Sequence, residues 1–149
     1  MKMLMMRMFY WQDNLLSYLQ FLTSPVLLIA RLYVGWVFFR SGLTKIQDWD
    51  STLYLFSEEY HVPILPPELA AYMGTGGELM LPILLVSGLL SRFAAIGLFI
   101  VNLVAANSLS EISEAALGQH ILWGTLIISI AIWGAGKLSV DTLIKRYIR

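Results

Sequence analysis

Four long apolar stretches dominate this sequence, over residues 25–43, 69–90, 93–107 and 117–134. A helix that crosses a membrane needs roughly 20 apolar residues at about 1.5 Å per residue, and these stretches approach or reach that length. Hydrophobic residues make up 58% of the 149 residues and charged residues only 13%, which sets the chain apart from ordinary water-soluble domains. The sequence therefore predicts an all-α integral membrane protein, in which residues 1–149 form one domain built on a four-helix transmembrane bundle.

The segment before the first stretch is amphipathic. Residues 9–22, "FYWQDNLLSYLQFL", place leucines at helical spacing, and the polar residues 12–14 interrupt the apolar run. We therefore expect an N-terminal helix lying in the membrane interface rather than a cleaved signal peptide. Ser24 and Pro25 are typical of a helix start, with serine as the N-cap and proline in the first turn. This pattern predicts that the first spanning helix begins here.

Two further short helices are expected outside the spans. Residues 51–60, "STLYLFSEEY", follow Asp50 as an N-cap and place apolar side chains on one face, so this segment of the outer loop is expected to lie on the bundle as a lid. The prolines of "HVPILPP" then return the chain in extended form. At the other end of the chain, Ser139 is the expected N-cap of a short C-terminal helix.

Charged residues are distributed unevenly between the two sides of the predicted bundle. The termini share a side with Arg92, Lys137, Lys145 and Arg146, whereas the loops of the opposite side carry Asp48, Asp50, Glu58, Glu59, Glu68, Glu111 and Glu114. Positively charged loops stay in the cytoplasm. We therefore expect both termini to be cytoplasmic.

Composition excludes several classes of function. The chain contains no cysteine, which rules out disulfides, thiol relays, iron–sulfur ligation and haem attachment through thioethers. A redox role would therefore need a bound cofactor or a partner subunit. The formal net charge is zero, so nothing supports nucleic-acid binding through a basic surface.

Three charged residues fall inside the apolar stretches, of which Arg40 is close to the outer interface, where its side chain can reach water, and Arg31 and Glu78 lie deeper. Arg31 shares one helical face with Phe38, Gly42 and Lys45, and Glu78 occupies a similar face of the second span. Counted from the expected outer helix ends, the two residues lie within roughly 5 Å of each other in height. A charge in the membrane centre costs at least about 2.5–3.5 kcal/mol. We therefore expect Arg31 and Glu78 to form a buried ion pair, which either fixes the helix register or takes part in function.

Other candidate residues lie near the outer ends of the spans. His120 precedes Trp123 by about one turn, and His61 lies in the outer loop. Two histidines could bind a metal or haem iron, but without a ligand-spacing motif they are a weak signal, and no confident metal site is assigned. Asn102 is expected to hydrogen-bond to a neighbouring helix rather than to a ligand.

Several of these pieces together resemble the DoxX family of bacterial membrane proteins. The matching segments are "RLYVGWVFFRSGLTKI", "GELMLPILLVSGLLSRFAAIGLFIVNLVAA" and "GAGKLSVD", which occur in the family's order and cover the spans. The resemblance carries over Arg31, Gly42, Lys45, Glu78, Gly88, Gly136, Ser139 and Asp141. Ala135 stands where the family often has proline. Relatives in this family include small subunits of thiosulfate:quinone oxidoreductases and members of membrane oxidoreductase complexes, while others are encoded beside modified metal-binding peptides.

The resemblance implies a bacterial inner-membrane subunit of a quinone-linked oxidoreductase system that is not catalytic alone. A quinone would occupy a pocket of the bundle near the Arg–Glu pair, with haem or a metal less favoured as the cofactor. Candidates for this pocket are Arg31, Trp36, Phe38, Lys45, Glu78, Asn102, His120 and Trp123. Expected partners are the lipid bilayer and a second protein subunit, and a homodimer is a further candidate. Two alternatives stay open: a non-enzymatic assembly protein for a periplasmic metal-handling or modified peptide, and a small-solute transporter.

Overall fold

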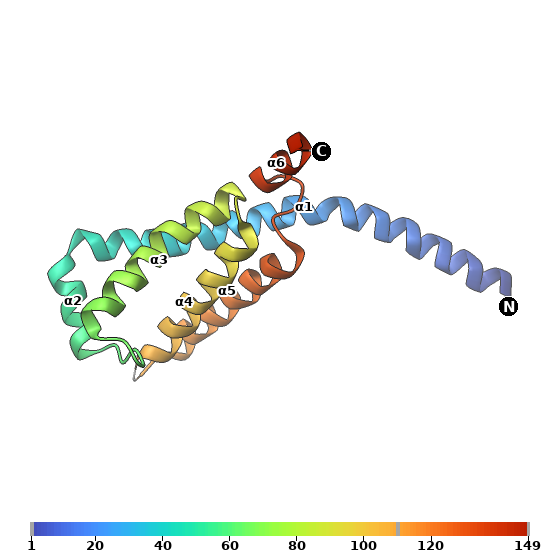
Figure 1. Cartoon of the computed structure of the whole chain (residues 1–149). Coiled ribbons are helices and arrows are strands. Elements are labelled where there is room, and N and C mark those ends of the chain that lie inside the picture. Colours follow the sequence, from blue (N-terminus) through green and yellow to red (C-terminus); the bar gives the residue numbers. More distant parts are fainter. Residues whose placement is uncertain (1, 110, 149) are drawn as a thin grey trace.

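The computed structural model describes residues 2–109 and 111–148, and over these residues it contains six helices (Figure 1). The long helices are α1 (Lys2–Gln47), α3 (Pro67–Ser87), α4 (Ser91–Ser108) and α5 (Glu114–Trp133), and the short ones are α2 (Trp49–Glu58) and α6 (Val140–Ile148). Each long helix contains a segment long and apolar enough to cross a membrane, which in α1 is Phe21–Gln47. The predicted all-α fold with four spanning helices is confirmed.

The long helices pack side by side in a closed ring. α1 contacts α3, α3 contacts α4, α4 contacts α5, and α5 returns to α1. Successive helices run in opposite directions, so α2 covers one end of the bundle and α6 lies at the other, beside the projecting N-terminal half of α1 (Figure 1). We call these the α2 end and the α6 end. The core between them is apolar and contains Leu27, Val34, Phe38, Leu85, Leu98, Ile127 and Ile130.

The predicted helix start at Ser24 and Pro25 is wrong, because α1 continues through both residues. Proline within a helix removes one backbone hydrogen bond, but membrane helices tolerate this where neighbouring groups compensate. Instead of capping α1, the Ser24 hydroxyl oxygen accepts a hydrogen bond from the Lys137 backbone N–H at 3.1 Å. Residues 9–22 therefore belong to α1 and project beyond the bundle (Figure 1). Their location in the membrane interface stays a prediction.

The short helix of the outer loop packs on the bundle as expected, but its cap differs. Asp48, not Asp50, is the N-cap, and its carboxylate accepts from the Ser51 backbone N–H at 3.0 Å. Hydrogen bonds from the Ser51 hydroxyl and backbone lower the pKa of Asp48. Phe56 is buried against Ala70 and Ala71 of α3. α2 is thus fixed to the bundle by its own apolar face.

The α6 end is closed by hydrogen bonds between distant parts of the chain. Ser139 caps α6 as predicted, accepting from the Thr142 backbone N–H at 3.2 Å. Asp141, in the first turn of α6, accepts from the backbone N–H of Leu90 at 2.9 Å and of Ser91 at 3.2 Å. The N-cap residue of α4, Leu90, supplies no side-chain hydrogen bond of its own. Asp141 therefore caps α4 from another helix.

Replacing Asp141 by alanine is expected to lower the free energy of unfolding by about 1–2 kcal/mol, because α4 loses its cap. Burial raises the pKa of Asp141, but hydrogen bonds from Leu90 and Ser91 outweigh it and leave the pKa below its usual value. The carboxylate therefore stabilises the fold above its unfolded-state pKa, and this contribution is lost as pH falls through the folded-state pKa. Thermal unfolding in detergent at several pH values measures both effects.

The control for this prediction is Asp50→Ala, which changes an exposed carboxylate at the start of α2 that is not its N-cap. This variant is expected to unfold within about 0.5 kcal/mol of the wild type, as is usual for surface substitutions. Equal melting temperatures for Asp141→Ala and wild type at neutral pH would show that Asp141 does not cap α4.

Candidate functional site

A cavity of about 410 Å³ lies within the bundle toward the α2 end. All four long helices contribute to its lining, together with Phe56 of α2 and the segment that follows α2. Most of the lining side chains are apolar or aromatic. The polar and charged lining residues are Ser41, Lys45, Tyr60, Glu78, Ser108 and His120. A mostly apolar cavity with a few polar groups is typical of a small-molecule site.

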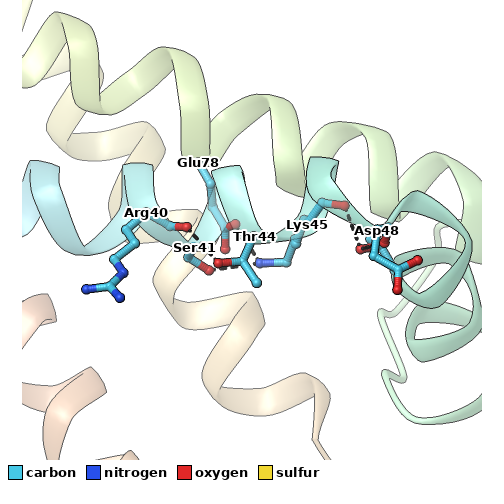
Figure 2. Close-up of polar contacts among 7 residues, drawn as sticks. Arg40, Ser41, Thr44, Lys45, Asp48 and Glu78 are labelled. Atoms are coloured by element: carbon cyan, nitrogen blue, oxygen red, sulfur yellow. Dashed lines mark hydrogen bonds and ion pairs between the residues drawn. The ribbon is translucent and has the colours of Figure 1, made fainter.

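An ion pair between Lys45 of α1 and Glu78 of α3 forms part of the cavity wall (Figure 2). The Lys45 Nζ lies 2.5 Å from the Glu78 Oε2 and also donates to the Ser41 Oγ at 3.0 Å. The side chains are 20% and 8% exposed, respectively. Gly42 faces Glu78 across the helix contact, where an added Cβ would lie 3.2 Å from the Glu78 Cβ. The missing side chain at Gly42 thus allows α1 and α3 to approach closely.

The predicted ion pair between Arg31 and Glu78 is wrong. Gly42 is level with Glu78, and Arg31 precedes Gly42 by eleven residues, or about 16 Å along α1. The prediction assumed that the outer ends of the two helices are level. Glu78 lies eleven residues from the start of α3 at Pro67, whereas Gly42 lies only five residues from the end of α1 at Gln47, so α3 extends farther than α1 at the α2 end. The cation that neutralises Glu78 is Lys45, which lies just beyond the end expected for the first span at residue 43.

Arg31 lies instead in a second cluster, at the α6 end. The side chain is fully buried, and its Nη2 donates to the Leu138 carbonyl oxygen at 2.5 Å. Gly88 lies against Arg31 and Ser139, and Asp141 caps α4 nearby. We call Arg31, Gly88, Leu138, Ser139 and Asp141 the latch. None of these residues lines the cavity, and their hydrogen bonds connect α1 and α4 to the segment around the start of α6.

His120 of α5 is held in position by Asn102 of α4. The Asn102 Nδ2 donates to the His120 backbone carbonyl at 3.0 Å, and its Oδ1 lies 2.9 Å from the His120 Nδ1. The prediction that Asn102 bonds to a neighbouring helix is therefore confirmed. Trp123 packs edge-on against His120 and Phe38, with ring centroids 5.0 and 5.9 Å apart. These rings form an aromatic wall of the cavity.

Not every candidate from the sequence reaches the cavity. Phe38, Lys45, Glu78, His120 and Trp123 line it, whereas Arg31, Trp36 and Asn102 do not. Trp36 is 63% exposed on the outside of the bundle, as expected of a side chain that faces lipid. His61 is exposed and lines a separate depression beside α2. In the described ranges, no group of three or more histidine, aspartate and glutamate side chains is placed to hold a metal.

Sequence reasoning missed Tyr60 and Ser41 as lining residues. Tyr60 lines the cavity, and burial raises the pKa of its hydroxyl, as do the charges of Glu59 and Glu78, so this hydroxyl stays neutral. Ser41 lies one turn before Lys45, a spacing that could have identified it as a partner for the ammonium group. Tyr60 was expected on the apolar face of residues 51–60 that lies on the bundle, together with Phe56, but the sequence could not show that this face borders a cavity.

The cavity reaches the outer surface of the bundle between α3 and α4. Met73, Ile100 and Val104 line the cavity and are also exposed. Deeper in the bundle, α3 and α4 meet where Gly77 packs against Val101. Because these helices carry membrane-spanning segments, the opening faces the lipid side of the bundle. We call Met73, Ile100 and Val104 the rim.

These features define a multi-pass helical membrane protein with an apolar cavity that contains an ion pair. The chain belongs to the DoxX family, whose model matches residues 26–111. A protein of Haemophilus influenzae described as uncharacterized is 33% identical over 129 residues, which cover 80% of this chain and 83% of the relative. No solved structure matches the chain. The segment matched to the family includes Lys45 and Glu78 but ends before His120.

Proposed function

We propose that the protein binds a quinone in the cavity and serves as an inner-membrane subunit of a quinone-linked oxidoreductase system. The observation that carries this proposal is the cavity itself, which opens toward lipid at the rim and holds the ion pair between Lys45 and Glu78. In this assignment both termini are cytoplasmic, so the cavity lies toward the outer face of the membrane.

The shape and chemistry of the cavity fit a quinone. Its volume of about 410 Å³ falls within the range of about 300–1,000 Å³ that is usual for ligand sites. Phe38 and Trp123 provide flat aromatic surfaces for the ring. An isoprenoid tail attached to that ring would leave through the rim and remain in the bilayer. A ligand that arrives from the lipid phase therefore needs no passage through water.

Hydrogen-bonding groups for the ring oxygens lie on the cavity wall. The Lys45 ammonium has three N–H groups, of which the Ser41 and Glu78 oxygens accept two, so one is left for a ligand oxygen. The neutral Tyr60 hydroxyl is a second donor. Because the chain has no cysteine, the proposal assigns electron transfer to or from the quinone to a partner subunit. The protein would then bind and orient the quinone rather than act alone.

Extraction of the purified protein tests this proposal. The protein is purified in mild detergent, extracted into organic solvent and analysed for quinone, and its affinity for a short-chain ubiquinone is then measured by titration. A quinone in the extract together with saturable binding supports the proposal. Absence of both overturns it and favours the assembly or transport alternatives.

A tryptophan at Ile100 is expected to weaken quinone binding about tenfold or more, because the larger side chain would fill the rim. The matched control is Ile96→Trp, which places the same residue one turn away on α4, at an exposed position that does not line the cavity. Both variants are expected to melt at the temperature of the wild type, as is usual for exposed positions. Equal affinities for the two variants would exclude the rim as the entrance.

A further inference from the structure

The contacts of Asn102 fix which ring nitrogen of His120 carries the proton. The backbone carbonyl of His120 can only accept a hydrogen bond, so the NH₂ group of the Asn102 amide must face it. This leaves the amide oxygen of Asn102 facing the His120 Nδ1 at 2.9 Å. Because an amide oxygen can only accept, Nδ1 must be the donor. In the neutral imidazole, the proton is therefore on Nδ1 and Nε2 is an acceptor.

Because Asn102 occupies Nδ1, Nε2 is the ring nitrogen that His120 has left for a ligand in the cavity, and it can only accept. His120 lines the cavity from α5, whereas Lys45 lines it from α1. A quinone has two carbonyl oxygens, both of which can only accept, so it satisfies the Lys45 ammonium but not the His120 Nε2. The reduced form has two hydroxyl groups, and each can both donate and accept. Only the quinol can therefore satisfy both groups.

We propose that the cavity binds the quinol form of its ligand more tightly than the quinone form, because Asn102 holds His120 as an acceptor. This inference rests on the proposed function and specifies the redox state that the site prefers. Asn102 is a positioning residue here, since it acts through His120 and does not line the cavity. The preference is expected to be about tenfold, the contribution of one hydrogen bond.

The experiment compares the affinities of the wild-type protein for menadione and for menadiol. Both are measured by anaerobic titration near pH 8, where an ordinary imidazole is neutral, and dithionite keeps the menadiol reduced. A tenfold tighter binding of menadiol supports the inference. Equal affinities, or tighter binding of menadione, overturn it while leaving the proposed quinone site intact. If neither compound binds, the proposed function fails and the inference fails with it.

Two variants of Asn102 test whether the ligand preference depends on which nitrogen of His120 carries the proton, rather than on a general effect of the substitution on folding. Asn102→Leu removes the acceptor for Nδ1, so the menadiol preference is expected to disappear. Asn102→Gln keeps an amide with both a donor and an acceptor and is expected to retain more of the preference than Asn102→Leu. The matched control is His61→Gln, because His61 is exposed and does not line the cavity. If Asn102→Leu retains the wild-type ratio of the two affinities, Asn102 does not set the preference.

Discussion

Replacing Lys45 by methionine is expected to lower the free energy of unfolding by about 3 kcal/mol or more. The Glu78 carboxylate, only 8% exposed, would lose the ammonium group that contacts its Oε2. Breaking a buried ion pair from one side is costly because the remaining charge has no partner. Thermal unfolding in detergent, followed by the intrinsic tryptophan fluorescence, measures the change.

Two controls show that the loss comes from the unpaired carboxylate. The double variant Lys45→Met with Glu78→Met removes both charges and is expected to recover most of the lost stability. Arg40→Met removes a cation from the same helix, but Arg40 is exposed and points away from the pair in Figure 2, so this substitution is expected to leave the stability nearly unchanged. A double variant that is no more stable than Lys45→Met would contradict the pairing.

The double variant also separates the two roles of the ion pair. If the pair served only to fix the register of α1 against α3, removing both charges would leave quinone affinity unchanged. If Lys45 also donates to the ligand, affinity falls although the protein stays folded. The expected loss is about tenfold, corresponding to one hydrogen bond to a charged group.

The spanning helices could be predicted from the sequence because their signal is local. A run of apolar residues long enough to cross a bilayer indicates a helix whatever its neighbours are. The lid segment could be predicted for the same reason, since Phe56 recurs at helical spacing with the apolar residues around it. The helix start expected at Ser24 and Pro25 was wrong, because α1 runs through both residues and the Ser24 hydroxyl bonds to the Lys137 backbone instead of capping a helix.

The partners of the charged residues could not be predicted, because they depend on the register of two helices. The sequence showed that Glu78 needs a cation and that Arg31 and Lys45 share one helical face. The choice between these two cations depends on how far the end of α3 extends past the end of α1. Here the offset is about six residues, or about 9 Å, which brings Lys45 rather than Arg31 to the height of Glu78. Helix ends are the least certain part of a prediction from sequence.

The contribution of Asp141 to the latch likewise depends on tertiary structure. The family resemblance identified Asp141 as part of a motif, and its position suggested the first turn of α6. Its hydrogen bonds to Leu90 and Ser91 link residues about fifty positions apart. No local pattern shows that α4 begins without a cap of its own. The cavity was similarly out of reach, because it depends on how five helices pack together.

Replacing Gly88 by alanine is expected to lower the free energy of unfolding by about 3 kcal/mol or more. Gly88 has a φ of 74°, a conformation that costs other residues roughly 1–2 kcal/mol. An added Cβ would also lie 2.6 Å from the Ser139 Cβ and overlap the Arg31 guanidinium. Because Arg31 is fully buried and Ser139 caps α6, neither can move without breaking the latch. Thermal unfolding of the detergent-solubilised variant measures the loss.

Gly76→Ala is the matched control, because it makes the same substitution in the middle of α3, where an added Cβ meets nothing within 4 Å. Alanine is preferred over glycine in a helix, so this variant is expected to be as stable as the wild type or up to about 1 kcal/mol more stable.

Neither glycine lies at the cavity, so the fraction of the Gly88→Ala protein that folds should bind quinone as the wild type does. A loss of affinity at unchanged stability would instead place the latch within the ligand site.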